Sequence, residues 1–476
     1  MKRMTPLFAF VVLALSAFDT APAFDPKPWA EDLDEVYQAF ATKYANLEWA
    51  VLQREADLPK LFAETKARID KASSDAEARA AFDRFARRLG DVHVVFDWPS
   101  AGHSTGAPSA LQPDVCAVLG YDAGMRAQPL AANAPGYQPL PTPQSSEFPA
   151  GVISLNGRRI GILQIGVFTP RGFPALCHAA LQSQSIPADK PCDNACSDRI
   201  HTWASDRLTR DLTAQLRALK DAGATVLVVD IAGNGGGTEW AEAVARMVTS
   251  IRLRSEEIGF VRGEHWAKAF AEDEASLRNF ADHETGQDRT RLLKLADEVE
   301  ARRKVALTPC DSQPLWQGAH PLCGWLGKGF YGSGLLASAD PAQLRATLLF
   351  APMEFPYGEG VWRDPLIVVV DRNVGSAASE FAAVLQDNHA AIIMGEPAGG
   401  GCGHTNDGTP TTLRNSKATL EVPDCARFRA DGSNEVMGIQ PDVLVAFHAA
   451  DGPHLRGIRF IAKLPEAVER ALALEH

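Results

Sequence analysis

Hydrophobic and polar residues follow a helical period in the first part of the chain. Three charged segments between residues 28 and 90 carry apolar positions at helical spacing: DLDEVYQAFATKY, LPKLFAETKARIDKA and DAEARAAFDRFARRL. Gly90 supplies a helix stop, and DVHVVFDW after it has the composition of a strand. We therefore expect an N-terminal helical domain, residues 24–98, that ends in a strand carrying His93.

Beyond residue 99 the pattern changes twice. Residues 99–152 are rich in Pro, Ala, Gly and Ser, which is typical of a linker. From residue 153 onward, buried strands such as TVLVVDI and PLIVVV alternate with amphipathic helices. This alternation predicts an α/β core with parallel strands over residues 153–476. A charged helical stretch, a Cys-bounded segment and a loop interrupt it, so residues 262–345 are predicted to be an insertion.

The first 23 residues have the pattern of a secretory signal peptide. Lys2 and Arg3 precede an apolar stretch, and Ala21-Pro22-Ala23 supplies small residues for cleavage. No later apolar run reaches the ~18 residues that span a bilayer. We expect a periplasmic or secreted protein with no membrane insertion after cleavage.

Charge and cysteine content narrow the partners. The net charge is −12 and no basic stripe occurs, which argues against nucleic acid or an anionic membrane as partner. An even number of cysteines, eight, lies after the signal peptide and indicates disulfides. No second Cys or His pair completes a zinc site with CDNAC, so no metal is expected.

Two disulfides are predicted from local excursions of the chain, Cys310–Cys323 and Cys402–Cys425, because each pair brackets a short segment. Cys177, Cys192 and Cys196 are expected to share one more bridge, and Cys116 to take the remaining thiol.

Four features sit at strand ends or in adjoining loops, where α/β folds place their sites. They are Ser376 in DRNVGSAASEF, the loop DIAGNGGG, His93 in LGDVHVVF, and Glu435 in DGSNEVMGIQPDVLV. Each has an ordinary alternative: a helix cap, a tight turn, a structural histidine and an exposed acid. The glycine loop lacks the Lys-Ser/Thr and G-x-G-x-x-G patterns of nucleotide sites, so no cofactor is expected.

Taken together, these features resemble the tail-specific (C-terminal-processing) serine proteases. The segments NVGSAASEFAAVLQDNHAAIIMGEPAGGG, DIAGNGGG and LRNSKATLEVP…DGSNEVMGIQPDVLV carry the resemblance. They look closest to the branch with tricorn protease and the repeats of interphotoreceptor retinoid-binding protein. The resemblance covers roughly residues 80–97, 153–250 and 350–448, in the family's order.

The resemblance implies a crotonase-like core with Ser376 as nucleophile and His93 as general base. It further implies that Glu435 orients this histidine. The oxyanion hole would come from the glycine loop and the following helix start, at Gly235, Gly236 and Ala377. The family's PDZ-type domain needs ~80–100 residues, more than residues 99–152 offer, and is expected to be absent or vestigial.

Several departures from the family pattern matter. Glycine replaces the lysine of the Ser/Lys branch in GEPAGGGCG, so a Ser/His enzyme is expected. Val92 stands where tricorn has a serine linking histidine to glutamate, so either Asp91 or Glu435 itself takes that role, or no residue does. Ala232 stands where the family has an arginine. The serine motif is one residue longer than usual, so an ungapped alignment places Ala377 at the nucleophile position, and Ser379 is an alternative nucleophile.

Two functions are compatible with these residues. The first is an exported serine endopeptidase that cleaves polypeptides through an acyl-enzyme on Ser376. The second is a catalytically inactive relative that binds a peptide or an apolar ligand in the same cleft. Cleavage preference and oligomeric state are not predicted.

Overall fold

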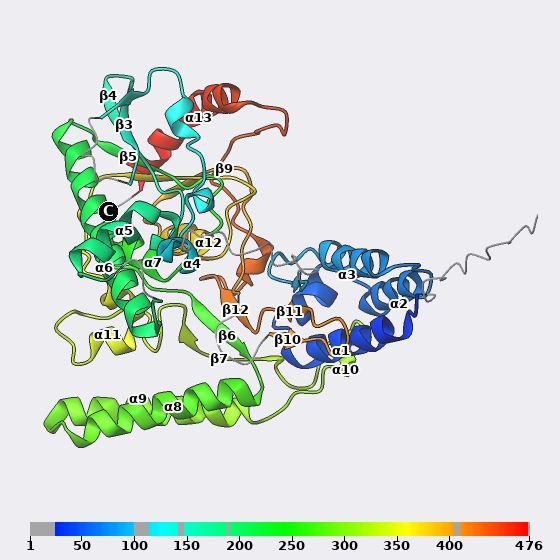
Figure 1. Ribbon diagram of the computed structural model, residues 1–476. Helices are drawn as coiled ribbons and strands as arrows, with labels where there is room; N and C mark the ends of the chain where they lie inside the picture. Colours follow the sequence, from blue (N-terminus) through cyan, green and yellow to red (C-terminus); the bar gives the residue numbers. More distant parts are fainter. Residues whose placement is uncertain (1–23, 100–113, 141–146, 188–190, 404–409, 475–476) are drawn as a thin grey trace, which may run out of the picture.

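A computed structural model describes residues 24–99, 114–140, 147–187, 191–403 and 410–474 (Figure 1). The predicted signal peptide, residues 1–23, lies outside them. Within the described ranges, no helix combines the length and the apolar composition that crossing a membrane requires.

A seven-stranded sheet forms the centre of the molecule, in the order β13-β9-β8-β5-β4-β3-β2. Within this sheet β4, β5, β8, β9 and β13 pair in parallel. At one edge, β3 pairs antiparallel with both β4 and β2. The predicted α/β class with parallel pairing is confirmed. The strands are β2 (Gln138–Pro139), β3 (Ala150–Leu155), β4 (Arg158–Gln164), β5 (Val226–Asp230), β8 (Leu366–Val370), β9 (Ile392–Gly395) and β13 (Val443–Leu444).

Helices cover both faces of this sheet. Because side chains alternate along a strand, Val368 and Val370 of β8 enter one core, whereas Ile367 and Val369 enter the other. Burial on both faces explains why these strands read as continuous apolar runs. The first core is covered by α5 (Pro174–Ser183), α6 (Asn194–Asp221), α7 (Trp240–Met247) and α12 (Ala377–Asp387), and the second by α13 (Pro453–Ala473).

The N-terminal helices pack against a small antiparallel sheet of order β1-β11-β10. Ser74 accepts a hydrogen bond from the N–H of Glu77 at the start of α3, and Gly90 ends α3 with φ +74°. This segment shares its core with strands from far along the chain, and the domain boundary at residue 98 stays a prediction. The elements are α1 (Lys27–Lys43), η1 (Trp49–Gln53), α2 (Leu58–Ile69), α3 (Asp75–Leu89), β1 (Val95–Asp97), β10 (Thr411–Thr412) and β11 (Thr419–Glu421).

His93 does not lie in a strand, contrary to the prediction. It occupies a turn between α3 and β1, where the Asp91 side chain accepts a hydrogen bond from the His93 N–H at 3.0 Å. An Asp that hydrogen-bonds the backbone two residues on favours a turn over a strand. The apolar composition of VHVVF does not reveal this.

Residues 262–345 contain a helical hairpin, α8 (Glu264–Asp282) and α9 (Gly286–Ala306), at the bottom of Figure 1. The part expected to be loop also contains β7 (Leu326–Tyr331). This strand pairs with β6 (Glu257–Val261), which pairs on its other side with β12 (Cys425–Phe428). The shorter elements are α4 (Val115–Val118), η2 (Ala123–Met125), η3 (Ala131–Asn133), η4 (Pro170–Gly172), α10 (Gln313–Trp316), α11 (Ala346–Leu349), η5 (Ala351–Glu354) and η6 (Glu435–Met437).

All eight cysteines are paired, and the predicted disulfides are confirmed. The bridges are Cys116–Cys177, Cys192–Cys196, Cys310–Cys323 and Cys402–Cys425.

Candidate active site

Ser376 occupies the sharp turn between the buried strand β8 and the helix α12. It is half-buried and has φ +53° and ψ −131°, a backbone conformation that residues with a side chain rarely adopt. Such strained positions recur at active sites, where the surroundings hold them in place. Ser379, the alternative nucleophile, is fully buried, and its hydroxyl donates to the Ser376 carbonyl at 2.7 Å.

The glycine loop packs directly against this turn. A Cβ added to Gly236 would lie 2.7 Å from Ser376 Cβ and 2.9 Å from the Ala377 nitrogen, closer than real Cβ contacts allow. The backbone carbonyl of Asn234 also accepts a hydrogen bond from the Gly375 N–H at 3.2 Å. A residue without a side chain is therefore required where the loop meets Ser376.

Two backbone N–H groups beside Ser376 donate to no described residue, those of Gly235 and Ala377. The space where a Gly235 side chain would stand is open. Gly236 differs, because its N–H donates to the Asn234 side chain at 2.8 Å. The expectation that the Gly236 N–H contributes to an oxyanion hole needs correction: in this structure it is occupied. The N–H groups of Gly235 and Ala377 have no acceptor among the described residues.

A second glycine-rich loop, Gly399–Gly403, brings the other candidate residues together. The Gly399 N–H donates to the carbonyl of Val374, two residues before Ser376. The Gly401 N–H donates to Glu435 Oε1 at 3.3 Å. A Cβ on Gly403 would lie 3.4 Å from Cδ2 and 3.7 Å from Nε2 of His93. Three motifs far apart in sequence thus meet along one short loop.

The side chain of His93 lies beside Asp91. Its Nδ1 lies 3.6 Å from Asp91 Oδ1, and its side chain is 15 % exposed. The buried carboxylate also accepts hydrogen bonds from Tyr44 at 3.0 Å and Asn46 at 2.9 Å. Burial raises the pKa of Asp91, but hydrogen bonds from His93 and Asn46 and the charge of His93 outweigh it and leave the pKa below its usual value. An ionised Asp91 therefore faces the imidazole.

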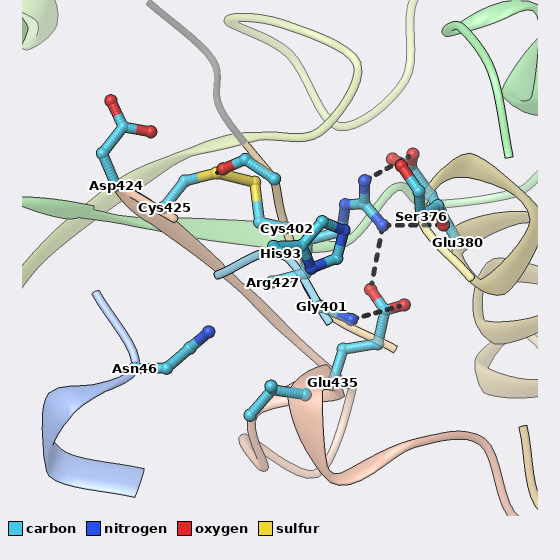
Figure 2. Close-up of a disulfide and its surroundings, with 12 residues drawn as sticks. Asn46, His93, Ser376, Glu380, Gly401, Cys402, Asp424, Cys425, Arg427 and Glu435 are labelled. Carbon is cyan, nitrogen blue, oxygen red and sulfur yellow. Dashed lines mark hydrogen bonds and ion pairs between the residues drawn. A yellow bond between two sulfur atoms is a disulfide. The ribbon is translucent and has the colours of Figure 1, made fainter. Parts of the chain in front are cut away.

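No described residue forms a hydrogen bond with the Ser376 hydroxyl, His93 included. Catalytic hydrogen bonds are often long until substrate binds. Figure 2 shows His93, Ser376 and Glu435 around the side chain of Arg427.

Glu435 contacts Arg427, whereas no hydrogen bond or ion pair joins it to His93 among the described residues. Glu435 Oε2 lies 3.3 Å from Arg427 Nη1, and the same nitrogen donates to the Ser376 carbonyl at 3.2 Å. Of the two candidates for orienting His93, Asp91 lies beside the imidazole in this structure, whereas Glu435 contacts Arg427. Val92 does not provide this link either, because its side chain points outward with 69 % of the residue exposed.

Arg427 lies among buried carboxyl groups. Burial lowers the pKa of Arg427, but the charges of Glu380, Glu435 and Glu256 raise it by more. The net shift is upward, so the guanidinium stays charged. Burial raises the pKa of Glu435, yet Arg427 and hydrogen bonds from neighbouring groups bring it below its usual value. Burial raises the pKa of Glu380 to about 8, although the charge of Arg427 opposes this shift and neighbouring acids add a little to it. Burial also raises the pKa of Glu256 well above its usual value. At neutral pH the ionised partner of Arg427 is therefore Glu435.

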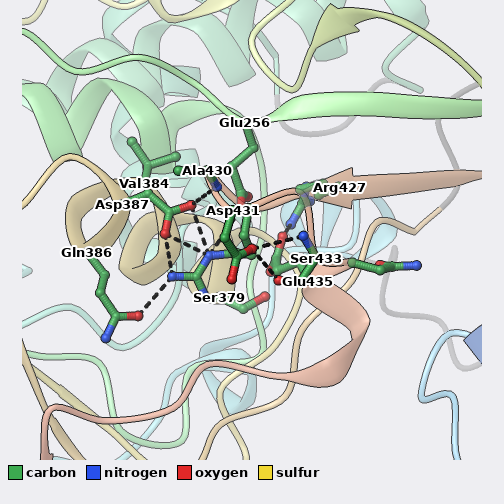
Figure 3. A network of polar contacts seen from close by, with 12 residues as sticks. Glu256, Ser379, Val384, Gln386, Asp387, Arg427, Ala430, Asp431, Ser433 and Glu435 are labelled. Atoms are coloured by element: carbon green, nitrogen blue, oxygen red, sulfur yellow. Dashed lines mark hydrogen bonds and ion pairs between the residues drawn. The ribbon is translucent and has the colours of Figure 1, made fainter. Parts of the chain in front are cut away.

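Arg429, two residues beyond Arg427, fixes the far end of α12. Its guanidinium donates to both carboxylate oxygens of Asp387, and its Nη2 donates to Gln386 Oε1 at 2.9 Å. The Ala430 N–H also donates to Asp387 at 2.9 Å (Figure 3). Residues two apart on an extended strand share a face. The chain at β12 therefore contacts α12 at both ends.

Sequence reasoning missed Arg427 and Asn46. A usable signal for Arg427 existed: Cys425, Arg427 and Arg429 alternate with Ala426 and Phe428, which places both arginines on the face that bears the disulfide. Asn46 carries no comparable local pattern, because its partners Asp91 and Asn434 lie elsewhere in the sequence.

Comparisons with known proteins bear on the family and the fold of the chain. The model of peptidase family S41 matches residues 199–445, slightly more than half of the chain. The crystal structure of mature CPAF is similar over 94 % of this chain and 98 % of its own, at 14 % identity and a TM-score of 0.53. The structure of mature CPAF complexed with lactacystin is similar over 94 % of this chain and 99 % of its own, at 13 % identity and a TM-score of 0.53. The similarity to the photosystem II D1 C-terminal processing protease covers 91 % of this chain and 96 % of that protease, at 14 % identity and a TM-score of 0.34. No curated protein sequence matches the chain.

The structural similarity to CPAF supports the fold, and the family model includes the glycine loop, Ser376 and Glu435 within its matched residues. The resemblance found in the sequence is confirmed: the chain belongs to peptidase family S41.

Proposed function

We propose that this protein is an exported serine endopeptidase of the Ser/His type that cleaves polypeptides through an acyl-enzyme on Ser376. The observation that carries the proposal is the loop Gly399–Gly403, which touches the Ser376 turn, Glu435 and His93. The glycines of this loop stand where the Ser/Lys branch has its lysine, which leaves His93 as the base. The helix-covered sheet and the family membership support a crotonase-like core.

The reaction begins with a proton transfer. Neutral His93 accepts the proton of the Ser376 hydroxyl at Nε2, while Asp91 faces Nδ1 and stabilises the imidazolium that forms. Ser376 Oγ then attacks the scissile carbonyl carbon. The oxyanion that results accepts hydrogen bonds from the N–H groups of Gly235 and Ala377.

The tetrahedral intermediate collapses when His93 returns its proton to the leaving amine and the peptide C–N bond breaks. Water, deprotonated by His93, then attacks the ester, and His93 returns this proton to Ser376 Oγ as the acyl C–O bond breaks, which regenerates the enzyme. The chain's own residues carry out each step.

Export is supported by the N-terminal sequence pattern and by four disulfides, which form in oxidising compartments. Identifying the mature N-terminus by mass spectrometry tests this part. A start at or near residue 24 is expected, and an intact Met1 in the extracellular or periplasmic protein would contradict it.

A fluorophosphonate probe tests the catalytic proposal. The wild-type protein is expected to form a covalent adduct that peptide mapping places on Ser376, and Ser376→Ala and His93→Ala to form none. A double variant should be no less reactive than either single variant, because the two residues act as a unit. Absence of labelling in the wild-type protein would favour a catalytically inactive family member.

A further inference from the structure

The peptide unit between Ser376 and Ala377 has an unusually well-occupied carbonyl. This oxygen accepts hydrogen bonds from Arg427 Nη1 at 3.2 Å and from the Ser379 hydroxyl at 2.7 Å. The backbone N–H groups of Ser379 and Glu380 add two more, at 3.0 and 3.1 Å. The N–H at the other end of the same unit, that of Ala377, donates to no described residue.

The two ends of a peptide unit are coupled. In a trans peptide the C=O and N–H bonds point in opposite directions, so fixing the carbonyl also fixes the direction of the N–H. A cationic donor on the carbonyl draws electron density from the amide and strengthens the N–H as a donor. The hydrogen bonds to the Ser376 carbonyl therefore fix the direction of the Ala377 N–H and strengthen it as a donor to the oxyanion.

We propose that Arg427 is a positioning residue of the oxyanion hole, and that Glu435 acts on the Ser376–Ala377 peptide through Arg427 rather than on His93. This inference rests on the proposed peptidase function and assigns a different task to each buried carboxylate. Asp91 serves the histidine, and Glu435 serves the nucleophile turn.

The surroundings of Arg427 suit this role. The side chain is buried, and its two terminal nitrogens pair with Glu435 at 3.3 Å and Glu380 at 3.4 Å. Its strand, β12, is held at its first residue by the Cys402–Cys425 bridge. A guanidinium held this firmly keeps its geometry while charge develops on the substrate.

Arg427→Lys is the central variant, since lysine keeps the positive charge but loses the planar fork that reaches a carboxylate and the carbonyl together. We expect kcat to fall about 10- to 100-fold and KM to stay within about twofold. The affinity for a peptide aldehyde, which mimics the tetrahedral intermediate, should fall by the same factor as kcat/KM.

Arg429→Lys is the matched control, because it makes the same change just beyond the end of β12, at a residue that pairs with Asp387 and not with Ser376. It is expected to lower the melting temperature while kcat stays within about twofold. Near-UV circular dichroism confirms that each variant is folded.

Glu435→Gln and Asp91→Asn separate the two tasks without large changes in shape. The rate of fluorophosphonate labelling is measured as a function of pH, and its midpoint reports the titration of the base. Glu435→Gln should lower kcat as Arg427→Lys does and leave this midpoint unchanged. Asp91→Asn should move that midpoint to lower pH, because the imidazolium loses its anion. This pair keeps the inference testable even where Arg427→Lys does not fold.

The inference is overturned if folded Arg427→Lys or Glu435→Gln keeps the wild-type kcat, or if Glu435→Gln moves the midpoint as Asp91→Asn does. A wild-type protein inert towards the fluorophosphonate probe is a different result. It refutes the proposed function, and this inference falls with it.

Discussion

Asn434 donates a hydrogen bond from Nδ2 to Asn46 Oδ1 at 2.8 Å, across 388 residues of sequence. Asn46 in turn donates to Asp91 Oδ2 at 2.9 Å, and Asn434 caps the short helix that begins at Glu435. Both amides are buried. One pair of side chains thus connects the turn that presents His93 with the turn that presents Glu435.

Replacing either asparagine should weaken folding and catalysis together. Asn46→Ala leaves the buried Asp91 carboxylate short of a donor, and a lost hydrogen bond to a charged group costs about 1.5–3 kcal/mol. Asn434→Ala should cost about 1–2 kcal/mol of unfolding free energy, measured in urea. Because the two residues touch, the double variant should lose about 0.5–3 kcal/mol less than the sum. Strict additivity of the two losses would show that the pair does not couple the turns.

The elements of the central sheet could be predicted because their signals are local. PLIVVV is buried on both faces, Gly90 has the left-handed conformation that ends a helix, and the cysteine pairs bracket short segments. These features depend on neighbouring residues and are readable from one sequence.

The site was only partly predictable, because its contacts are not local. A strand and a turn both suit VHVVF, and only the Asp91 side chain decides between them. The occupied N–H of Gly236 and the pairing of Glu435 with Arg427 depend on packing between distant segments. A pattern identifies residue types with chemical potential, whereas the direction of each hydrogen bond follows from the tertiary structure.

Removing the Cys402–Cys425 bridge should harm activity more than stability. Closing a 23-residue separation is worth about 3 kcal/mol of unfolding free energy in the chain-entropy model. The bridge also holds the loop Gly399–Gly403 that touches His93 and Glu435, so kcat of Cys402→Ser/Cys425→Ser should fall at least about tenfold.

The double variant Cys310→Ser/Cys323→Ser is the matched control. It opens a bridge of separation 13, whose Cys310 packs on a different hydrophobic cluster from Cys402 and Cys425, and should lose comparable stability while keeping kcat. Equal kcat values for the two double variants would mean that the Cys402–Cys425 bridge does not organise the site.

Stability should fall as pH rises from about 5 to 9, and Glu380→Gln should reduce that fall. The pKa of Glu380 is raised to about 8 by burial, and that of Asp230 to about 6 for the same reason. Between the usual carboxyl value and these values, the folded protein holds protons that the unfolded chain releases, so rising pH favours unfolding. Glutamine cannot lose a proton, which removes one contribution and leaves those of Asp230 and Glu256.

Urea unfolding at several pH values measures this effect. Glu466→Gln serves as control, because the Glu466 side chain is 40 % exposed and hydrogen bonding to Lys463 lowers its pKa, away from this pH window. The control should give a curve parallel to the wild type. A Glu380→Gln curve that is also parallel would show that Glu380 ionises normally in the folded protein.

Gly236→Ala should disable the site even though alanine is the smallest change. Gly236 has φ +112°, and its added Cβ would lie 2.7 Å from Ser376 Cβ and 2.9 Å from the nitrogen of Ala377. Relief of this contact has to displace either the nucleophile or the oxyanion donor. Fluorophosphonate labelling should fall at least about 100-fold, the size of effect seen when one oxyanion donor is lost.

Gly235→Ala is the comparison for folding, because its Cβ meets nothing within 4 Å and its φ is ordinary. We expect Gly235→Ala to keep the wild-type melting temperature and Gly236→Ala to lower it. Wild-type labelling by Gly236→Ala would mean that the glycine loop does not press on Ser376 in solution.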